Sequence, residues 1–216
     1  MINDNRLLKI VQDMQAKHGC HTVILYGSRA RNEPTNTSDY DIIAIREQGD
    51  FMRDCRIFEG FYLDAFIYPE DSIKNPDVSF IRIKDGIVLV QKEKIGETLI
   101  NKIKSIFQQG APNTAAWEKV EISTWTKKML QRAKENDIEG NFRRHWLLHD
   151  LLECYFKMRD SWYLGPKESF QWLKTNDPET YSAFEVALQP NASLNDIENL
   201  IEKITTIKSK NENMHE

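Results

Sequence analysis

The residues best suited to chemistry lie close together in residues 23–45, which read VILYGSRARNEPTNTSDYDIIAI. An apolar run ends at Gly27 and Ser28, a polar loop follows, and Asp39 and Asp41 open a second apolar run. Because residues i and i+2 of a strand project to the same side, we expect these two carboxylates to lie together at a strand end. Paired carboxylates suit Mg²⁺, and pairs of such ions clamp phosphates in phosphoryl transfer. The pattern therefore predicts a magnesium-dependent phosphate site.

Two simpler explanations of this stretch account for fewer of its residues. Ser38 or Asp39 could cap a helix, but the isoleucines that follow Asp41 favour a strand. A calcium loop also begins with Asp-x-Asp, but it requires a third acidic or amide ligand, a glycine and a distant Glu at fixed offsets. A phosphate site uses all the parts, because Gly27 lets the backbone approach a phosphate and Ser28 adds a hydroxyl at a helix start, which favours anions.

The ordered set of features resembles the nucleotidyltransferase superfamily built on the DNA polymerase beta fold. The set consists of a strand, Gly27-Ser28, eleven residues from Ser28 to Asp39, and the Asp39-x-Asp41 pair that opens the next strand. The resemblance covers roughly residues 5–92. It implies that a nucleoside monophosphate passes from ATP or another nucleoside triphosphate to a hydroxyl, with release of pyrophosphate and with two Mg²⁺ ions as cofactors.

Asp64 is the predicted third carboxylate of the site. It interrupts the apolar residues 61–67, and a charge in an apolar strand is costly unless it is paired or bound to a metal. In the superfamily the third carboxylate lies on a strand after the Asp-x-Asp, so the resemblance implies that Asp39, Asp41 and Asp64 form the catalytic and metal-binding set. Two alternatives stay open, namely an outward-facing Asp64 on an edge strand and an ion pair with a nearby arginine.

Two arginines directly follow Ser28 in the sequence. We predict that Arg29 and Arg31 bind the nucleotide together with Gly27 and Ser28, with one of the arginines reaching the triphosphate. The alternative is that both are solvated on the first turn of a helix.

A second cluster of candidate residues lies in the carboxyl-terminal half. Glu153 and Lys157 are four residues apart and share a helix face, so spacing alone indicates an exposed ion pair. However, Glu-x-x-x-Lys-x-Arg-Asp followed by Gly165-Pro166 resembles the carboxyl-terminal domain of the kanamycin nucleotidyltransferases. That resemblance implies that Glu153 is the general base and Lys157 a phosphate ligand. Other aminoglycoside adenylyltransferases use the strand carboxylate as base, which would give this role to Asp64.

Hydrophobic periodicity predicts an α+β protein, in which a small mixed sheet is followed by an all-helical bundle. The break at residues 109–113 separates a nucleotidyltransferase domain over residues 1–110 from a helical acceptor-binding domain over residues 111–216. The expected helices span residues 5–17, 95–109, 115–136, 139–163, 167–175 and 193–209, and the expected strands span 21–27, 39–46, 56–68 (with a turn or bulge at 59–60) and 87–91. All five tryptophans follow the break, and we expect them to fill the core of the bundle.

The composition is that of an ordinary soluble protein, with 40% apolar and 29% charged residues. The formal net charge of −4 argues against broad electrostatic binding to nucleic acid, and no apolar run approaches membrane-spanning length. The first residues lack the pattern of a signal peptide, and the three widely spaced cysteines suit a reducing compartment. We therefore expect a cytoplasmic protein that binds neither nucleic acid nor membrane, and the resemblance to the kanamycin enzymes implies a homodimer.

These patterns together predict a nucleotidyltransferase that uses ATP and adenylylates a small hydroxylated acceptor such as an aminoglycoside. Two alternatives remain. One is an adenylyltransferase of the toxin–antitoxin type that modifies a protein. The other is a catalytically idle nucleotide-binding regulatory module, which is less consistent with the presence of all three candidate carboxylates.

Overall fold

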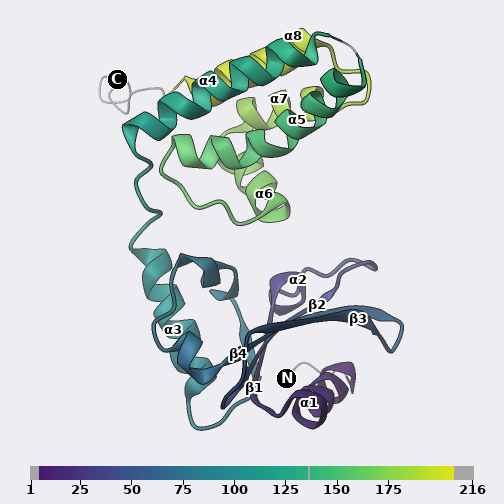
Figure 1. The fold of residues 1–216 in the computed structure, drawn as a ribbon, viewed down its shortest axis with the longest axis vertical. Helices are drawn as coiled ribbons and strands as arrows, with labels where there is room; N and C mark the ends of the chain where they lie inside the picture. Colours follow the sequence, from purple (N-terminus) through teal and green to yellow (C-terminus); the bar gives the residue numbers. More distant parts are fainter. Residues whose placement is uncertain (1–4, 136, 207–216) are drawn as a thin grey trace. The chain divides into compact units, whose positions relative to one another are not determined.

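The computed structural model describes residues 5–135 and 137–206 and divides the chain into two compact units, Met1–Gln109 and Gly110–Glu216 (Figure 1). The first unit combines a sheet with helices, whereas the described residues of the second form helices and loops. The predicted α+β class, a mixed sheet followed by a helical region, is confirmed. Among the described residues, no helix is both long and apolar enough to cross a bilayer.

The amino-terminal unit is built on a sheet with the strand order β3-β4-β2-β1-β5. The strands are β1 (Cys20–Tyr26), β2 (Tyr40–Arg46), β3 (Met52–Phe58), β4 (Phe61–Pro69) and β5 (Ile87–Val90). Strands β2 and β4 are parallel, and the other neighbouring strands are antiparallel. The carboxyl end of β1 therefore lies beside the amino-terminal ends of β2 and β4. The predicted carboxylates lie at these strand ends, along one edge of the sheet.

Helices cover both faces of this sheet, which explains why its inner strands are apolar almost throughout. Helix α1 (Asn5–His18) packs on the face that carries Val23. Helix α3 (Ile95–Gln108) and the 3₁₀ segment η2 (Val78–Ile83) pack on the face that carries Ile24. A second 3₁₀ segment, η1 (Glu70–Ile73), follows β4 directly. The single-turn helix α2 (Gly27–Ala30) follows β1 and leads into the polar loop.

The long predicted strand over residues 56–68 is two strands in the structure. The chain turns at Glu59 and Gly60, which both have positive φ angles of 51° and 83°. Glycine adopts such angles without strain, so this turn divides the apolar stretch into a hairpin. Strand β3 also begins four residues before the predicted start, at Met52 rather than at residue 56.

The helical unit packs around one apolar core. Its helices within the described residues are α4 (Ala116–Ala133), α5 (Ile138–Met158), α6 (Pro166–Asn176), α7 (Pro178–Ala187) and α8 (Leu194–Thr205). Helix α5 is the longest and supplies the fully buried Leu147 and Leu151, and both α4 and α5 pack against α8. Asp137 caps α5 by accepting a hydrogen bond from the Gly140 backbone amide at 2.7 Å.

Three predictions for the helical half are wrong. Helix α7 was not predicted, although Asp177-Pro178 is an N-cap followed by proline in the first turn. Helix α5 ends five residues before the predicted residue 163, and Asp160 directly after it has a positive φ of 50°. The five tryptophans do not together fill the core, although the partly buried Trp125 packs against it. Trp117, Trp146 and Trp172 are exposed, because aliphatic side chains with Tyr155, Phe156 and Phe184 already fill the space between the helices.

Candidate active site

The turn after β1 brings Gly27 against a carboxylate of the next strand. Gly27 has a φ of +70°, and a Cβ atom at this position would lie 2.3 Å from Asp41 Oδ2. Both the backbone angle and the close approach therefore require glycine here. The Ser28 hydroxyl has no hydrogen-bonding partner in the described part of the chain, which leaves it available to a ligand. Because α2 is a single turn, the stabilisation of a bound anion that we predicted from the helix start is small.

The structure brings the three predicted carboxylates together at the sheet edge. Asp39 immediately precedes β2, and Asp41 lies two residues further on the same side of the strand. Asp41 is paired in parallel register with Asp64 of β4. Burial, followed by the charges of Asp39 and Asp64, raises the pKa of Asp41 from 3.8 to about 6, although Arg82 and Arg31 oppose this. The carboxylates repel one another, so a bound cation would stabilise their ionised forms.

Asp64 has an arginine partner in the structure. Arg53 of β3 donates hydrogen bonds from Nε to Asp64 Oδ1 at 2.7 Å and from a terminal nitrogen to Oδ2 at 2.8 Å. The Arg53 guanidinium also lies 4.9 Å from the centroid of the Phe66 ring. This is the ion pair named above as an alternative for Asp64, although β4 is an inner strand and not an edge strand. Each oxygen of Asp64 thus accepts one hydrogen bond from Arg53, which compensates part of the charge of this carboxylate.

The residues at this edge fit a divalent cation. Their oxygen ligands are of the hard type that Mg²⁺ prefers, and the raised pKa of Asp41 marks negative charge without full compensation. Among residues 5–135 and 137–206, however, no three His, Cys, Asp or Glu side chains are already assembled as metal ligands. Asp64 is instead paired with the Arg53 guanidinium at 2.7 Å. The role of Asp39, Asp41 and Asp64 as metal ligands stays a prediction.

The arginines near the site occupy different positions. Arg29 donates hydrogen bonds to the backbone carbonyl oxygens of Ser38 and Asp39. Arg31 lies 3.5 Å from Glu33 and lowers the pKa of Asp41. Arg82, which sequence reasoning missed, acts on Asp41 in the same way and lies over the Tyr26 and Phe66 rings. Its only sequence signal is an arginine between two isoleucines in η2.

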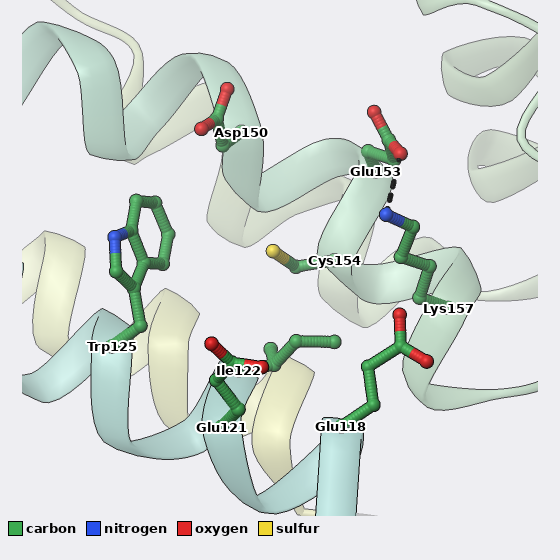
Figure 2. A pocket seen from close by; sticks show the side chains of 8 residues that line it. All are labelled: Glu118, Glu121, Ile122, Trp125, Asp150, Glu153, Cys154 and Lys157. Atoms are coloured by element: carbon green, nitrogen blue, oxygen red, sulfur yellow. Dashed lines mark ion pairs between the residues drawn. The ribbon is translucent and has the colours of Figure 1, made fainter. Parts of the chain in front are cut away.

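The two predicted residues of the helical unit line a pocket of about 310 Å³ formed by α4 and α5 (Figure 2). Glu153 and Lys157 form an ion pair at 2.9 Å, and both side chains are 47% exposed. The pair agrees with the interpretation from spacing alone, but it lies at a pocket and not on a featureless helix face. The pocket is acidic. Helix α4 contributes Glu118, Glu121 and Trp125, and α5 contributes Asp150 beside the pair.

The other two residues of the Glu-x-x-x-Lys-x-Arg-Asp pattern have structural contacts. Arg159 donates hydrogen bonds to the carbonyl oxygens of Lys203 and Ile204 at the end of α8. Asp160 accepts hydrogen bonds from the Thr114 backbone amide and from the Lys119 side chain, both at 2.7 Å. These contacts hold the end of α5 within the helical unit, so they leave only Glu153 and Lys157 for a role in catalysis.

Comparison with known proteins places the amino-terminal unit in a family. Residues 5–108 match the nucleotidyltransferase domain family. Among solved structures, the chain is similar to a nucleotidyltransferase-like protein from Exiguobacterium sibiricum 255-15, with 13% identity, a TM-score of 0.39, and coverage of 92% of this chain and 74% of that chain. No curated protein matches the sequence. Through this match the amino-terminal unit is a nucleotidyltransferase domain, which makes the protein an enzyme of the transferase class.

Proposed function

We propose that this enzyme transfers AMP from ATP to a hydroxyl of a small, amine-bearing acceptor such as an aminoglycoside. One observation carries the proposal: Asp41 is in register with Asp64, next to Asp39 and against the Gly27-Ser28 turn. This arrangement gathers negative charge at the place where the metal ion of a metal–nucleotide complex would bring positive charge. A module that only bound nucleotides would not require three carboxylates that repel one another.

In the proposed reaction the acceptor oxygen attacks the α-phosphorus of ATP. The bond from this phosphorus to the oxygen that bridges to the β-phosphate breaks, and pyrophosphate leaves with the bond's electron pair. Asp39, Asp41 and Asp64 would hold Mg²⁺, which neutralises phosphate charge when it is bound. Ser28 and Arg31 contact the phosphates, and Glu153 takes the proton from the acceptor hydroxyl, with Asp64 as the alternative base. The chain thus contributes mainly position and charge.

The pocket between α4 and α5 supports an acceptor that carries amines. Four carboxylates and one lysine line it, so its side chains carry a net negative charge. Trp146 Nε1 donates a hydrogen bond to Asp150 at 2.7 Å, which orients that carboxylate. Trp125 offers an aromatic surface of the kind that attracts ammonium groups (Figure 2). At about 310 Å³ the pocket suits a small molecule.

The direct test is to incubate the protein with labelled ATP, GTP, CTP or UTP, Mg²⁺ and a panel of aminoglycosides. We expect transfer from ATP to at least one aminoglycoside, detected as a labelled product and released pyrophosphate. Transfer of the label to a protein and not to an aminoglycoside would show that the acceptor is a protein, contrary to our proposal. A lack of transfer from every nucleotide to every acceptor would contradict the proposed function.

We expect Ser28→Ala to weaken ATP binding while leaving acceptor binding unchanged. The substitution removes one hydrogen bond to a charged phosphate, which contributes about 1–2 kcal/mol, or roughly a five- to thirtyfold change in Kd. Calorimetric titration with ATP measures the effect. Ser105→Ala on the exposed side of α3 is the matched control and should bind ATP normally. An unchanged ATP affinity of the Ser28 variant would remove this serine from the phosphate site.

Glu121→Gln should raise the KM for an aminoglycoside and leave the KM for ATP unchanged. Within the described residues, Glu121 has no hydrogen-bonded or ion-paired partner, so its charge is available to the acceptor. We expect the acceptor KM to rise about fivefold, as for the loss of one partly exposed ion pair. Glu198→Gln on the exposed side of α8 removes the same charge outside the pocket and serves as control. Equal effects of the two substitutions would argue against an acceptor site here.

A further inference from the structure

We propose that Arg29 is a positioning residue that fixes the backbone of the catalytic carboxylate Asp39, and not a ligand of the nucleotide. This inference rests on the proposed function, because it gives Arg29 its task in that reaction. Arg29 Nε donates a hydrogen bond to the Asp39 carbonyl oxygen at 2.9 Å. One of its terminal nitrogens donates to the Ser38 carbonyl oxygen at 2.6 Å. The guanidinium thus binds two consecutive carbonyl groups at the end of the polar loop.

The guanidinium also lies over aromatic rings. It lies 4.0 Å from the centroid of the Tyr40 ring and 5.8 Å from that of the Phe61 ring. Tyr40 is only 2% exposed and packs edge-on against Phe61, so this aromatic support is itself held by the core. Arginine can stack and form a rigid hydrogen-bonding fork at once, whereas lysine can do neither. The contacts therefore depend on the shape of the side chain as well as on its charge.

Asp39 needs such support because the sheet does not hold it. The parallel pairing of β2 with β4 begins at Tyr40, and the antiparallel pairing with β1 reaches no further than Asp41. Before Asp39, the loop is tied by a local turn, in which the Ser38 hydroxyl accepts a hydrogen bond from the Thr35 amide at 2.8 Å. The Arg29 side chain connects this turn to the start of β2. Without this side chain, the backbone of Asp39 would be held only through the strand pairing that begins at the next residue, Tyr40.

The two arginines after Ser28 therefore have separate tasks. Arg31 acts on the carboxylates, since its charge lowers the pKa of Asp41. Arg29 instead donates from Nε and from one terminal nitrogen to backbone carbonyls of the loop. A phosphate that took over these two donors would release the residue that the reaction needs in place.

The test compares Arg29→Lys, which keeps the charge, with the wild-type protein. We expect kcat to fall about tenfold or more, because a small displacement of Asp39 misaligns the reacting groups. The Kd for ATP should stay within about twofold in calorimetric titration, since no phosphate contact is lost. Hydrogen–deuterium exchange should become faster in a peptide that spans residues 33–41. Arg132→Lys on the exposed side of α4 is the control and should change none of these quantities.

The opposite pattern would overturn this role for Arg29. If Arg29 binds the triphosphate, Arg29→Ala should weaken ATP binding about tenfold, Arg29→Lys should restore most of it, and exchange in residues 33–41 should be unchanged in both variants. The exchange and calorimetric measurements require no acceptor. They therefore decide the role of Arg29 even if no acceptor is adenylylated, which would count against the proposed function alone.

Discussion

Asp41→Asn is expected to abolish nucleotidyl transfer and, at the same time, to stabilise the fold. The pKa of Asp41 is raised from 3.8 to about 6 in the folded protein, first by burial and then by Asp39 and Asp64. Folding therefore disfavours the ionised carboxylate. Below pH 3.8 this carboxyl is neutral in both states and costs nothing, whereas stability falls as the pH rises through about 6. At pH 8 the folded wild-type protein is therefore destabilised by the full free-energy cost of ionising the buried Asp41 carboxylate.

The size of this effect follows from the difference between the folded and unfolded pKa values. A difference of about two pH units corresponds to roughly 3 kcal/mol. Because asparagine must still satisfy its own hydrogen bonds, we expect the free energy of unfolding at pH 8 to increase by about 1–3 kcal/mol. The gain should shrink toward zero at pH 4.

Urea denaturation at pH 8 and at pH 4 measures this effect, in parallel with a transfer assay. Asp50→Asn, at an exposed carboxylate in the loop between β2 and β3, is the control and should change neither quantity. An Asp41→Asn protein that transfers AMP at the wild-type rate would exclude Asp41 from the catalytic set. A variant that is less stable than the wild type at pH 8 would show that the Asp41 carboxylate is compensated in the folded protein.

Glu153→Gln is expected to lower kcat by about 10²- to 10⁴-fold, the range that a general base contributes. The substitution keeps the shape of the side chain but removes its basicity, so the affinity for ATP should persist. Single-turnover measurements of AMP transfer, together with calorimetric titration of ATP, separate these two quantities. Asp64→Asn should behave differently and weaken ATP binding in the presence of Mg²⁺, because Asp64 is paired with Asp41 and not placed in the acceptor pocket.

The control for Glu153 is a second ion pair on the same helix. Glu139 and Arg143 also lie four residues apart on α5 and form an ion pair at 2.9 Å. Glu139→Gln should leave kcat unchanged, because this pair lies outside the pocket residues. If Glu153→Gln is as harmless as Glu139→Gln, the base is Asp64 and the Glu153–Lys157 pair is an ordinary surface interaction, which contributes only a few tenths of a kcal/mol.

The sequence by itself was sufficient for the class of the protein and for placing the residues of the candidate site in one short segment. Gly27, Ser28, Asp39 and Asp41 lie in one short segment, and their arrangement depends on local geometry. Alternate residues of a strand share a face, and glycine adopts a positive φ more readily than any other residue. Helices and strands with a strong apolar period were likewise predictable, as for α1 and β1. At residues 59–60 a glycine interrupts the apolar pattern of residues 56–68, and the sequence left a turn and a bulge as alternatives there.

Only the tertiary structure decided which residues surround the candidate site. The hairpin of β3 and β4 brings Arg53 to Asp64, and packing of η2 brings Arg82 near Asp41, and the local sequence does not specify which carboxylate either arginine meets. The close contact between Gly27 and Asp41, and the use of Arg29 by loop carbonyls, likewise depend on strand register and on the path of the loop. Side chains far apart in sequence meet through packing of the whole unit, which sequence spacing does not encode.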